Sequence, residues 1–335
     1  MTNQLQSAVE DGPPKADVRE RRSRFLSFMT GYYLQVTTAV VIVGLSVFVP
    51  DFGNRANLQN IATQASFAGL VACGMTLLIT AGLFDLSVAG IIAVVGVVTA
   101  KVLPATTIGM ALLLAIAVGI LLGLTNGVVV TKLRIPPFIS TFGMLNIYLA
   151  VAFIATGGQV IPINSYYFQQ LGTATVAGVP LVFIAFFVVA AASYCLLYRT
   201  YFGRRLRAIG SSEPAARMAG IPVDRVKILA FGLTGLFTAI AAIGLSALLS
   251  SSGGTMAKDM ELNAIAITVV GGTALRGGRG TLLGTFTAAI FITVIANALN
   301  VLDVSSYVQN IVTGLILIAA LIVGSVRKDV VRGAG

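Results

Sequence analysis

Long apolar stretches alternate with short polar ones along most of the chain. An apolar helix needs about 20 residues to cross the hydrocarbon core of a bilayer, and most of these stretches reach that length. The stretch near 262–274 is shorter and contains Gly271-Gly272, so we expect a broken or tilted helix buried among other helices. The pattern predicts ten membrane-spanning helices, at residues 31–49, 58–80, 86–103, 108–131, 137–155, 179–198, 228–249, 262–274, 281–300 and 307–325.

The positions of Lys and Arg predict which helix ends face the cytoplasm. Cytoplasmic segments of membrane proteins carry an excess of these residues. With a cytoplasmic N-terminus, only Arg55, Lys101 and Lys258 fall on the outer side, and the other 19 of the 22 Lys and Arg residues fall inside. One span more or fewer in mid-chain would scramble this asymmetry. We therefore predict an all-α integral membrane protein of about ten helices, with both termini in the cytoplasm.

The composition agrees with a chain that lies mostly in lipid, and it excludes several kinds of function. Of the 335 residues, 57% are hydrophobic and 10% are charged, whereas a soluble domain has about 25% charged residues. The net charge of +10 follows from the cytoplasmic Lys and Arg, so it does not indicate nucleic-acid binding. The absence of histidine excludes His-based catalytic triads and the usual histidine-bearing zinc sites. Cys73 and Cys195 lie in apolar runs and cannot form a metal cluster alone.

Polar segments flank one large membrane domain. Residues 1–30 form an N-terminal cytoplasmic tail, of which 1–24 are polar and charged and are expected to be disordered. The membrane domain covers 31–325, and 326–335 form a C-terminal cytoplasmic tail. The outer loop 156–178 has too few apolar residues for a core of its own, so we expect no second soluble domain.

The cytoplasmic loop 199–227 contains a complete short helix. Ser212 is a good N-cap, Pro214 is acceptable in the first turn, Gly220 fits the left-handed position after the last turn, and Pro222 stops propagation. A helix of about two turns is not stable alone in water. It is therefore either a connector held by the membrane domain or a docking helix for a cytoplasmic partner. Its residues are Ser212, Glu213, Pro214, Ala215, Ala216, Arg217, Met218, Ala219 and Gly220.

The same loop carries a resemblance to a known family. GRRLRAIGSSEPAARMAGI at 203–221 resembles the cytoplasmic coupling loop of ribose-type ABC sugar importer permeases, in the branched-chain amino acid/sugar permease superfamily. AGLFDLSVAG at 81–90, IPPFISTFGML at 135–145 and ELNAIAITVVGGTALRGGRGTLLGT at 261–285 are similar to further segments of that family. Phe84 and Ala89 depart from it, since isoleucine and glycine are usual there. The resemblance covers residues from about 57 to 325.

The resemblance implies a permease with a type II-like importer bundle and several partners. Such permeases work as pairs, so a second copy of this chain is expected, in a bacterial inner membrane. They receive sugar from an extracytoplasmic sugar-binding protein and are driven by a cytoplasmic ATP-binding subunit. The loop 199–227 would couple the permease to that subunit. This chain would then be a transport subunit and not an enzyme.

The glycine-rich run Gly271–Gly280 is not a nucleotide site. It lacks the Gly-Lys-Ser/Thr ending of a phosphate-binding loop and follows no soluble strand. We expect a tight turn, because glycine permits positive φ angles and close helix contact. No cofactor is expected on this chain, and ATP and Mg²⁺ would bind to the partner ATPase.

Polar side chains within the spans are few. Asp85 lies where an inner turn enters a helix, so we interpret it as a cap for the amides of that helix start, although an acid within a membrane is otherwise a candidate proton relay. A buried amide or hydroxyl needs a partner, so each polar residue either bonds neighbouring helices or lines the transport pathway. Gly119, Gly123 and Gly127 are spaced for close helix packing. The pathway or gate candidates are Asp85, Ser87, Asn126, Ser140, Thr141, Asn146, Thr268 and Asn297.

Three other functions remain as alternatives. A self-sufficient secondary carrier or channel needs intramembrane ion-coupling groups, and few acids lie within the spans. A membrane-embedded enzyme needs a cluster of nucleophile, base or metal ligands, which the sequence does not supply. A permease for branched-chain amino acids is the nearest alternative, and the stretch Asp85-Leu86-Ser87-Val88 favours sugars only through the resemblance.

Overall fold

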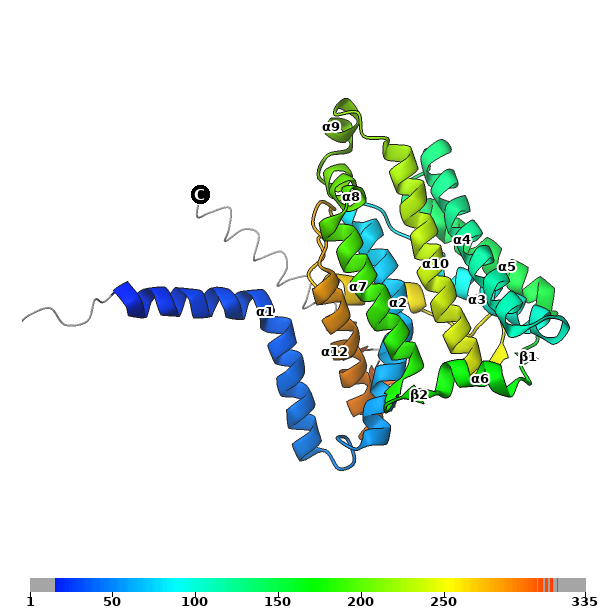
Figure 1. Ribbon diagram of the computed structural model, residues 1–335, viewed down its shortest axis with the longest axis horizontal. Coiled ribbons are helices and arrows are strands. Elements are labelled where there is room, and N and C mark those ends of the chain that lie inside the picture. Colours follow the sequence, from blue (N-terminus) through cyan, green and yellow to red (C-terminus); the bar gives the residue numbers. More distant parts are fainter. Residues whose placement is uncertain (1–15, 306, 310, 313, 316–317, 319–335) are drawn as a thin grey trace, which may run out of the picture.

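Helices make up nearly all of the regular structure (Figure 1). The computed structural model describes residues 16–305, 307–309, 311–312, 314–315 and 318. Within these residues, seven helices are long and apolar enough to cross a membrane. They are α2 (Arg55–Thr80), α3 (Val88–Val102) with the 3₁₀ turn η1 (Leu103–Ala105), α4 (Ile108–Lys132), α5 (Pro137–Thr156), α7 (Leu181–Arg199), α10 (Val223–Leu249) and α12 (Leu282–Val301).

Two shorter apolar helices also coincide with predicted spans. They are the second part of α1, Tyr32–Phe48, and α11 (Met260–Val270). These nine helices coincide with nine of the ten predicted spans, including the short one at 262–274. The predicted span at 307–325 lies largely outside the described residues, and the tail at 326–335 lies wholly outside them.

The N-terminal tail differs from the prediction. Helix α1 (Ala16–Phe48) includes residues 16–24, which we expected to be disordered, and it is kinked at Tyr32, where φ is −120° and ψ is 21°. Four of the nine residues 16–24 are Arg, which is a good helix former, so the charge of this segment does not prevent a helix. Figure 1 shows the first part of α1 turning away from the bundle. Residues 1–15 lie outside the described part.

Short elements gather at the two ends of the bundle. At one end, α8 (Tyr201–Ser211) and α9 (Glu213–Met218) follow α7, and we call this the α9 end (Figure 1). At the opposite end lie α6 (Tyr166–Thr173) and two small antiparallel pairs. Strand β1 (Ile161–Pro162) pairs with β4 (Ser251–Ser252), and β2 (Thr175–Val176) pairs with β3 (Val179–Pro180).

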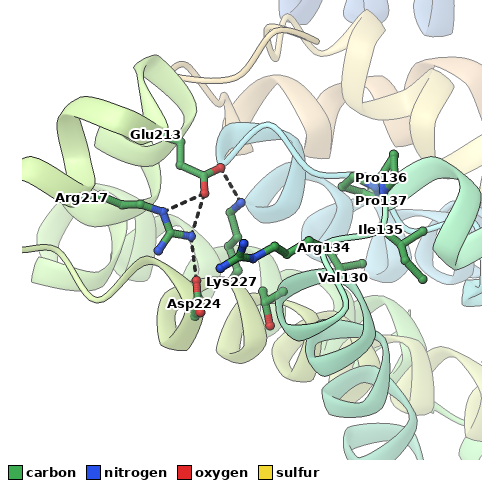
Figure 2. A pocket seen from close by; sticks show the side chains of 10 residues that line it. Val130, Arg134, Ile135, Pro136, Pro137, Glu213, Arg217, Asp224 and Lys227 are labelled. Atoms are coloured by element: carbon green, nitrogen blue, oxygen red, sulfur yellow. Dashed lines mark hydrogen bonds and ion pairs between the residues drawn. The ribbon is translucent and has the colours of Figure 1, made fainter.

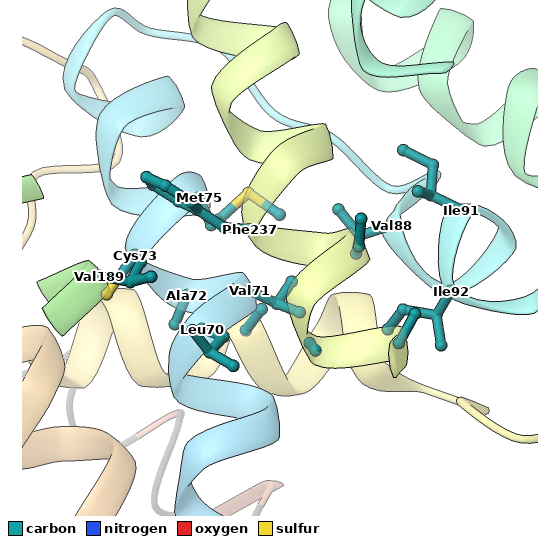
Figure 3. Close-up of a cluster of buried hydrophobic side chains, with 14 of the residues drawn as sticks. Leu70, Val71, Ala72, Cys73, Met75, Val88, Ile91, Ile92, Val189 and Phe237 are labelled. Carbon is teal, nitrogen blue, oxygen red and sulfur yellow. The ribbon is translucent and has the colours of Figure 1, made fainter. Parts of the chain in front are cut away.

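The core lies where α2, α3 and α10 meet. Most of α2 is buried, whereas most residues of the apolar helices α4 and α5 are not buried, as expected for helices on the outside of the bundle. Figure 3 shows side chains of α2, α3, α7 and α10 in this core, among them Leu70, Ile91, Val189 and Phe237. All four belong to one continuous cluster of buried apolar residues.

Glycines bring α4 and α10 into close contact, as the spacing of four predicted. A methyl group added at Gly127 would lie 2.7 Å from the Cα of Ile228, and one at Gly119 2.8 Å from the carbonyl oxygen of Gly235. Side chains at these positions would push the helices apart, so the glycines set the distance between α4 and α10.

Candidate functional site

The local sequence forms α9 in the predicted way. The Ser212 side chain accepts a hydrogen bond from the amide of Ala215 at 3.4 Å, and Pro214 occupies the first turn. Gly220 has a φ angle of +75°, the left-handed conformation that glycine adopts at low cost. The helix is therefore specified by its caps.

Ion pairs hold α9 against α10 (Figure 2). Arg217 bonds Glu213 within α9 at 2.9 Å and Asp224 at the start of α10 at 2.7 Å. Lys227 of α10, whose side chain is only 12% exposed, bonds Glu213 at 2.6 Å. Lys132 at the end of α4 extends the network to Asp224 at 3.4 Å. A helix too short to be stable alone is thus fixed by charges on its neighbours.

The charge of Glu213 is stabilised by this network. Partial burial raises the pKa of the Glu213 carboxyl, but hydrogen bonds and charges from Lys227 and Arg217 outweigh burial, so the pKa lies below its usual value. Glu213 therefore remains ionised at neutral pH and keeps both of its partners.

The other face of α9 is open to solvent. Ala216 is buried, whereas Pro214, Ala215 and Met218 are not, and Met218 is 90% exposed. A flexible apolar side chain of this kind is suited to fit into a partner surface. One face of α9 is anchored and the other is available for docking.

A cavity of about 540 Å³ lies beside α9 (Figure 2). Charged residues from α9 and α10 line one side, and the turn between α4 and α5 lines the other. The lining residues are Val130, Thr131, Arg134, Ile135, Pro136, Pro137, Glu213, Arg217, Asp224 and Lys227.

Helix α8 precedes α9 and was not predicted. Its buried residues Gly203, Leu206 and Ile209 are spaced by three, which is an amphipathic signal that the many arginines of the loop concealed. On its inner side, Gly210 packs on the end of α2 and on the glycine-rich turn, where the amide of Gly278 donates to the carbonyl of Thr80 at 2.8 Å. The run Gly271–Gly280 is thus a tight turn against α8.

Four of the predicted polar residues meet in one buried network near the start of α3. The Asp85 carboxylate accepts hydrogen bonds from the amide of Ser87 at 2.9 Å and from its hydroxyl at 2.6 Å. Asn126 of α4 donates to the Ser87 hydroxyl at 2.6 Å, and the Tyr148 hydroxyl lies 2.9 Å from the Asn126 oxygen. Thr141 of α5 accepts from the amide of Leu86 at 3.0 Å. The network ties the turn between α2 and α3 to α4 and α5.

The other four candidates lie apart from this network. The Thr268 hydroxyl donates to a carbonyl of its own helix and lies 3.3 Å from a carbonyl of α2, and Asn297 exchanges two hydrogen bonds of 2.9 Å with Asn57 of α2. Asn146 is exposed and donates to a carbonyl of its own helix. The Ser140 hydroxyl is buried and has no hydrogen-bond partner among the described residues.

Several partners of the candidate residues could not be predicted from the sequence. Tyr148, Asn57 and Lys227 each bond a residue of another helix, which lies 22, 240 and 14 positions away in the chain. Spacing along one helix gives no signal for such pairs.

Comparison with known proteins gives a consistent result. Residues 57–321 match the family model described as branched-chain amino acid transport system / permease component. The L-arabinose transport system permease protein AraH of Escherichia coli K12 is 36% identical over 90% of this chain and 92% of its own. The ribose import permease protein RbsC of Bacillus subtilis is 36% identical over 87% and 91%, and that of Escherichia coli K12 is 35% identical over 88% and 93%. No solved structure matches the chain.

Proposed function

Because the chain belongs to the family of branched-chain amino acid transport system permease components, we propose that it is the permease subunit of an ATP-binding-cassette importer for a sugar. The arabinose and ribose permeases, which are about a third identical over nearly their whole length, support a monosaccharide or similar polyol as the cargo. The resemblance predicted from the sequence is thereby confirmed. The chain is a multi-pass protein of the bacterial inner membrane.

The observation that carries the proposal is the anchored and half-exposed helix α9. Two ion pairs to α10 fix its position, and its exposed face projects from the bundle (Figure 1). A short helix held rigidly can transmit a movement of its docking partner to α10. In the proposal, the α9 end faces the cytoplasm, both chain termini lie on that side, and a separate ATP-binding subunit docks on α9.

The mechanism is alternating access. ATP and Mg²⁺ bind to the separate subunit, which performs the hydrolysis, and this chain carries no cofactor. Closure of two ATP-binding subunits moves two copies of α9, and the helices of a permease homodimer rearrange around a path between them. A sugar-binding protein delivers the cargo at the opposite end.

Co-purification and transport test this function together. We expect the chain, isolated from its native membrane in mild detergent, to retain an ATP-binding subunit in a stoichiometric amount by mass spectrometry. Proteoliposomes with this complex and the binding protein should take up ribose or arabinose only with ATP. A chain that purifies alone and moves solute without ATP would instead be a secondary carrier, and uptake of leucine in place of sugars would assign the amino acid class.

A further inference from the structure

A second cavity, of about 220 Å³, lies where α3 and α11 begin. Part of its wall is apolar, from α3 and α5, and the segment before α11 supplies polar groups. Pockets for drug-sized ligands have about 300–1,000 Å³, so the occupant of this cavity must be smaller. The lining residues are Ala89, Leu145, Leu149, Phe153, Gly254, Thr255, Ala257, Lys258, Asp259 and Glu261.

The cavity extends from the middle of the bundle toward the end opposite α9. Leu145, Leu149 and Phe153 are about 12, 18 and 24 Å along α5 from Pro137, which is at the α9 end, counted at about 1.5 Å per residue. Helix α11 has 11 residues and is about 16 Å long, roughly half of a 30 Å hydrocarbon core. Its last residue leads into the glycine-rich turn at the α9 end, so its first residue lies at middle depth.

Interrupted helices of this kind mark binding sites in membrane transporters. Where a helix starts inside the membrane, its free amides and the unwound segment before it offer polar groups that lipid could not satisfy. Helix α11 starts in this way, after the unwound residues 253–259. Such a segment is tolerated only where it is covered by protein or lines a polar path.

The chemistry of the lining fits a sugar. Thr255, Lys258 and Asp259 are exposed, and none of them has a side-chain hydrogen bond or ion pair to another described residue. Glu261 has one buried carboxylate oxygen that likewise has no partner within the described part of the chain. Hydroxyl groups can donate to the carboxylates and accept from the ammonium group. One ammonium group, from Lys258, and two carboxylates, from Asp259 and Glu261, line the cavity, so a hydroxyl-rich solute finds both donors and acceptors there.

The apolar side of the cavity offers a surface on which the C–H groups of a sugar ring can pack. Phe153 is 38% exposed, and a methyl group added at Gly254 would lie 2.7 Å from its ring. Gly254 therefore lets the backbone of the polar segment approach the aromatic ring closely. An aromatic or apolar wall opposite a few placed polar groups is the usual design of a small-molecule pocket.

Asp259 also has an unusual backbone conformation. Its φ angle is +61°, in the left-handed region that non-glycine residues seldom adopt. Strain of this kind collects at functional sites. Here it turns the chain from the unwound segment into α11.

We propose that this cavity is a transient binding site for a single sugar on its way through the permease. The inference rests on the proposed function, because it takes its ligand class from there. The cavity is small and few polar groups line it, so we expect weak binding that does not trap the cargo.

The first test is direct binding. The chain has no Trp, so Phe153→Trp introduces a single Trp into the full-length chain at the wall of the cavity, and excitation at a wavelength that Tyr does not absorb reports on it alone. We expect ribose or arabinose to change its fluorescence in a saturable way. A second substitution, Asp259→Asn, in the Phe153→Trp chain should abolish the fluorescence change. Asp51→Asn is the matched control, because Asp51 is also exposed and has a φ angle of +60°. Asn tolerates this conformation, so both variants are expected to fold.

The second test is transport by the complex with the ATP-binding subunit in proteoliposomes. Thr255→Val and Asp259→Asn should each lower the maximal rate of ATP-dependent sugar uptake at least five-fold, whereas Asp51→Asn should leave the rate unchanged. Normal sugar uptake by these variants, or fluorescence that sugars do not change, would overturn the binding site and leave the proposed function intact. Failure of the wild-type complex to take up either sugar with ATP would overturn both.

Discussion

Reversing the charges of α9 tests whether ion pairs position it. The double variant Glu213→Arg/Arg217→Glu keeps an oppositely charged pair within α9. It places a positive side chain at position 213 beside Lys227 and a negative one at position 217 beside Asp224, so both ties to α10 become repulsive. We expect α9 to leave its position, because six residues do not form a stable helix alone.

The size of the effect follows from the exposure of each pair. The Arg217–Asp224 pair, with side chains 51% and 30% exposed, is screened by solvent, so we count no free energy for it. The Lys227–Glu213 bond is more buried on the lysine side, and it contributes about 1–2 kcal/mol after allowing for solvent screening. Losing this bond and replacing it by repulsion raises the free energy of the docked position of α9 by roughly 2–3 kcal/mol. Since about 1.4 kcal/mol is a factor of ten, the equilibrium that positions α9 should shift by one to two orders of magnitude.

The assay is sugar uptake per ATP hydrolysed in proteoliposomes. We expect at least a ten-fold loss in the double variant with normal membrane insertion. Adding Asp224→Arg and Lys227→Glu restores the sign of both ties. It also makes the Lys132 pair repulsive, but that pair is long and solvent-screened, so most of the coupling should recover. Arg225→Glu is the control, because Arg225 is exposed and has no ion pair with any described residue. Normal coupling in the double variant, or no recovery in the fourfold variant, would refute the reasoning.

Three further outcomes are expected. Gly127→Ala should destabilise the chain by about 1–3 kcal/mol in detergent-induced unfolding, because the new methyl group would lie 2.7 Å from a backbone atom of α10, whereas Gly109→Ala on the same helix meets open space and should have little effect. Tyr148→Phe should cost about 1 kcal/mol in the same assay, since the hydroxyl loses its bond to Asn126 or to a backbone carbonyl; unchanged stability would contradict the network. The folded pKa of Glu213 is lowered, so its contribution to docking of α9 is present above the ordinary pKa of about 4.3 and is lost as the pH falls through the folded pKa. As the pH falls through the folded pKa, the α9 amides of the wild type should lose protection from hydrogen exchange, after correction for intrinsic rates. The α9 amides of Glu213→Gln should show no such change.

The contacts of the polar residues could be predicted from the sequence only in part. Asp85 was interpreted as a cap for the amides of a helix start, which is wrong, because α3 begins at Val88 after Ser87 and has no side-chain cap hydrogen bond. The Asp85 carboxylate instead accepts the amide of Ser87 itself. That Asn126 and Tyr148 join it could not be read from the sequence, because it depends on how α4 and α5 are rotated against α3. Asn146 was an equal candidate and is exposed on the outside of α5.

The sequence by itself determined the apolar helices and the short helix α9. Bilayer thickness fixes the length of an apolar span, and local caps such as Ser212 and Gly220 fix where a helix begins and ends. Only the tertiary structure decided which polar groups meet, since the pairs Lys227–Glu213 and Asn57–Asn297 join separate elements. The same holds for the cavity at α11, because its lining residues come from α3, α5, α11 and the segment before α11. Local interactions set the elements, and packing between distant segments sets the sites.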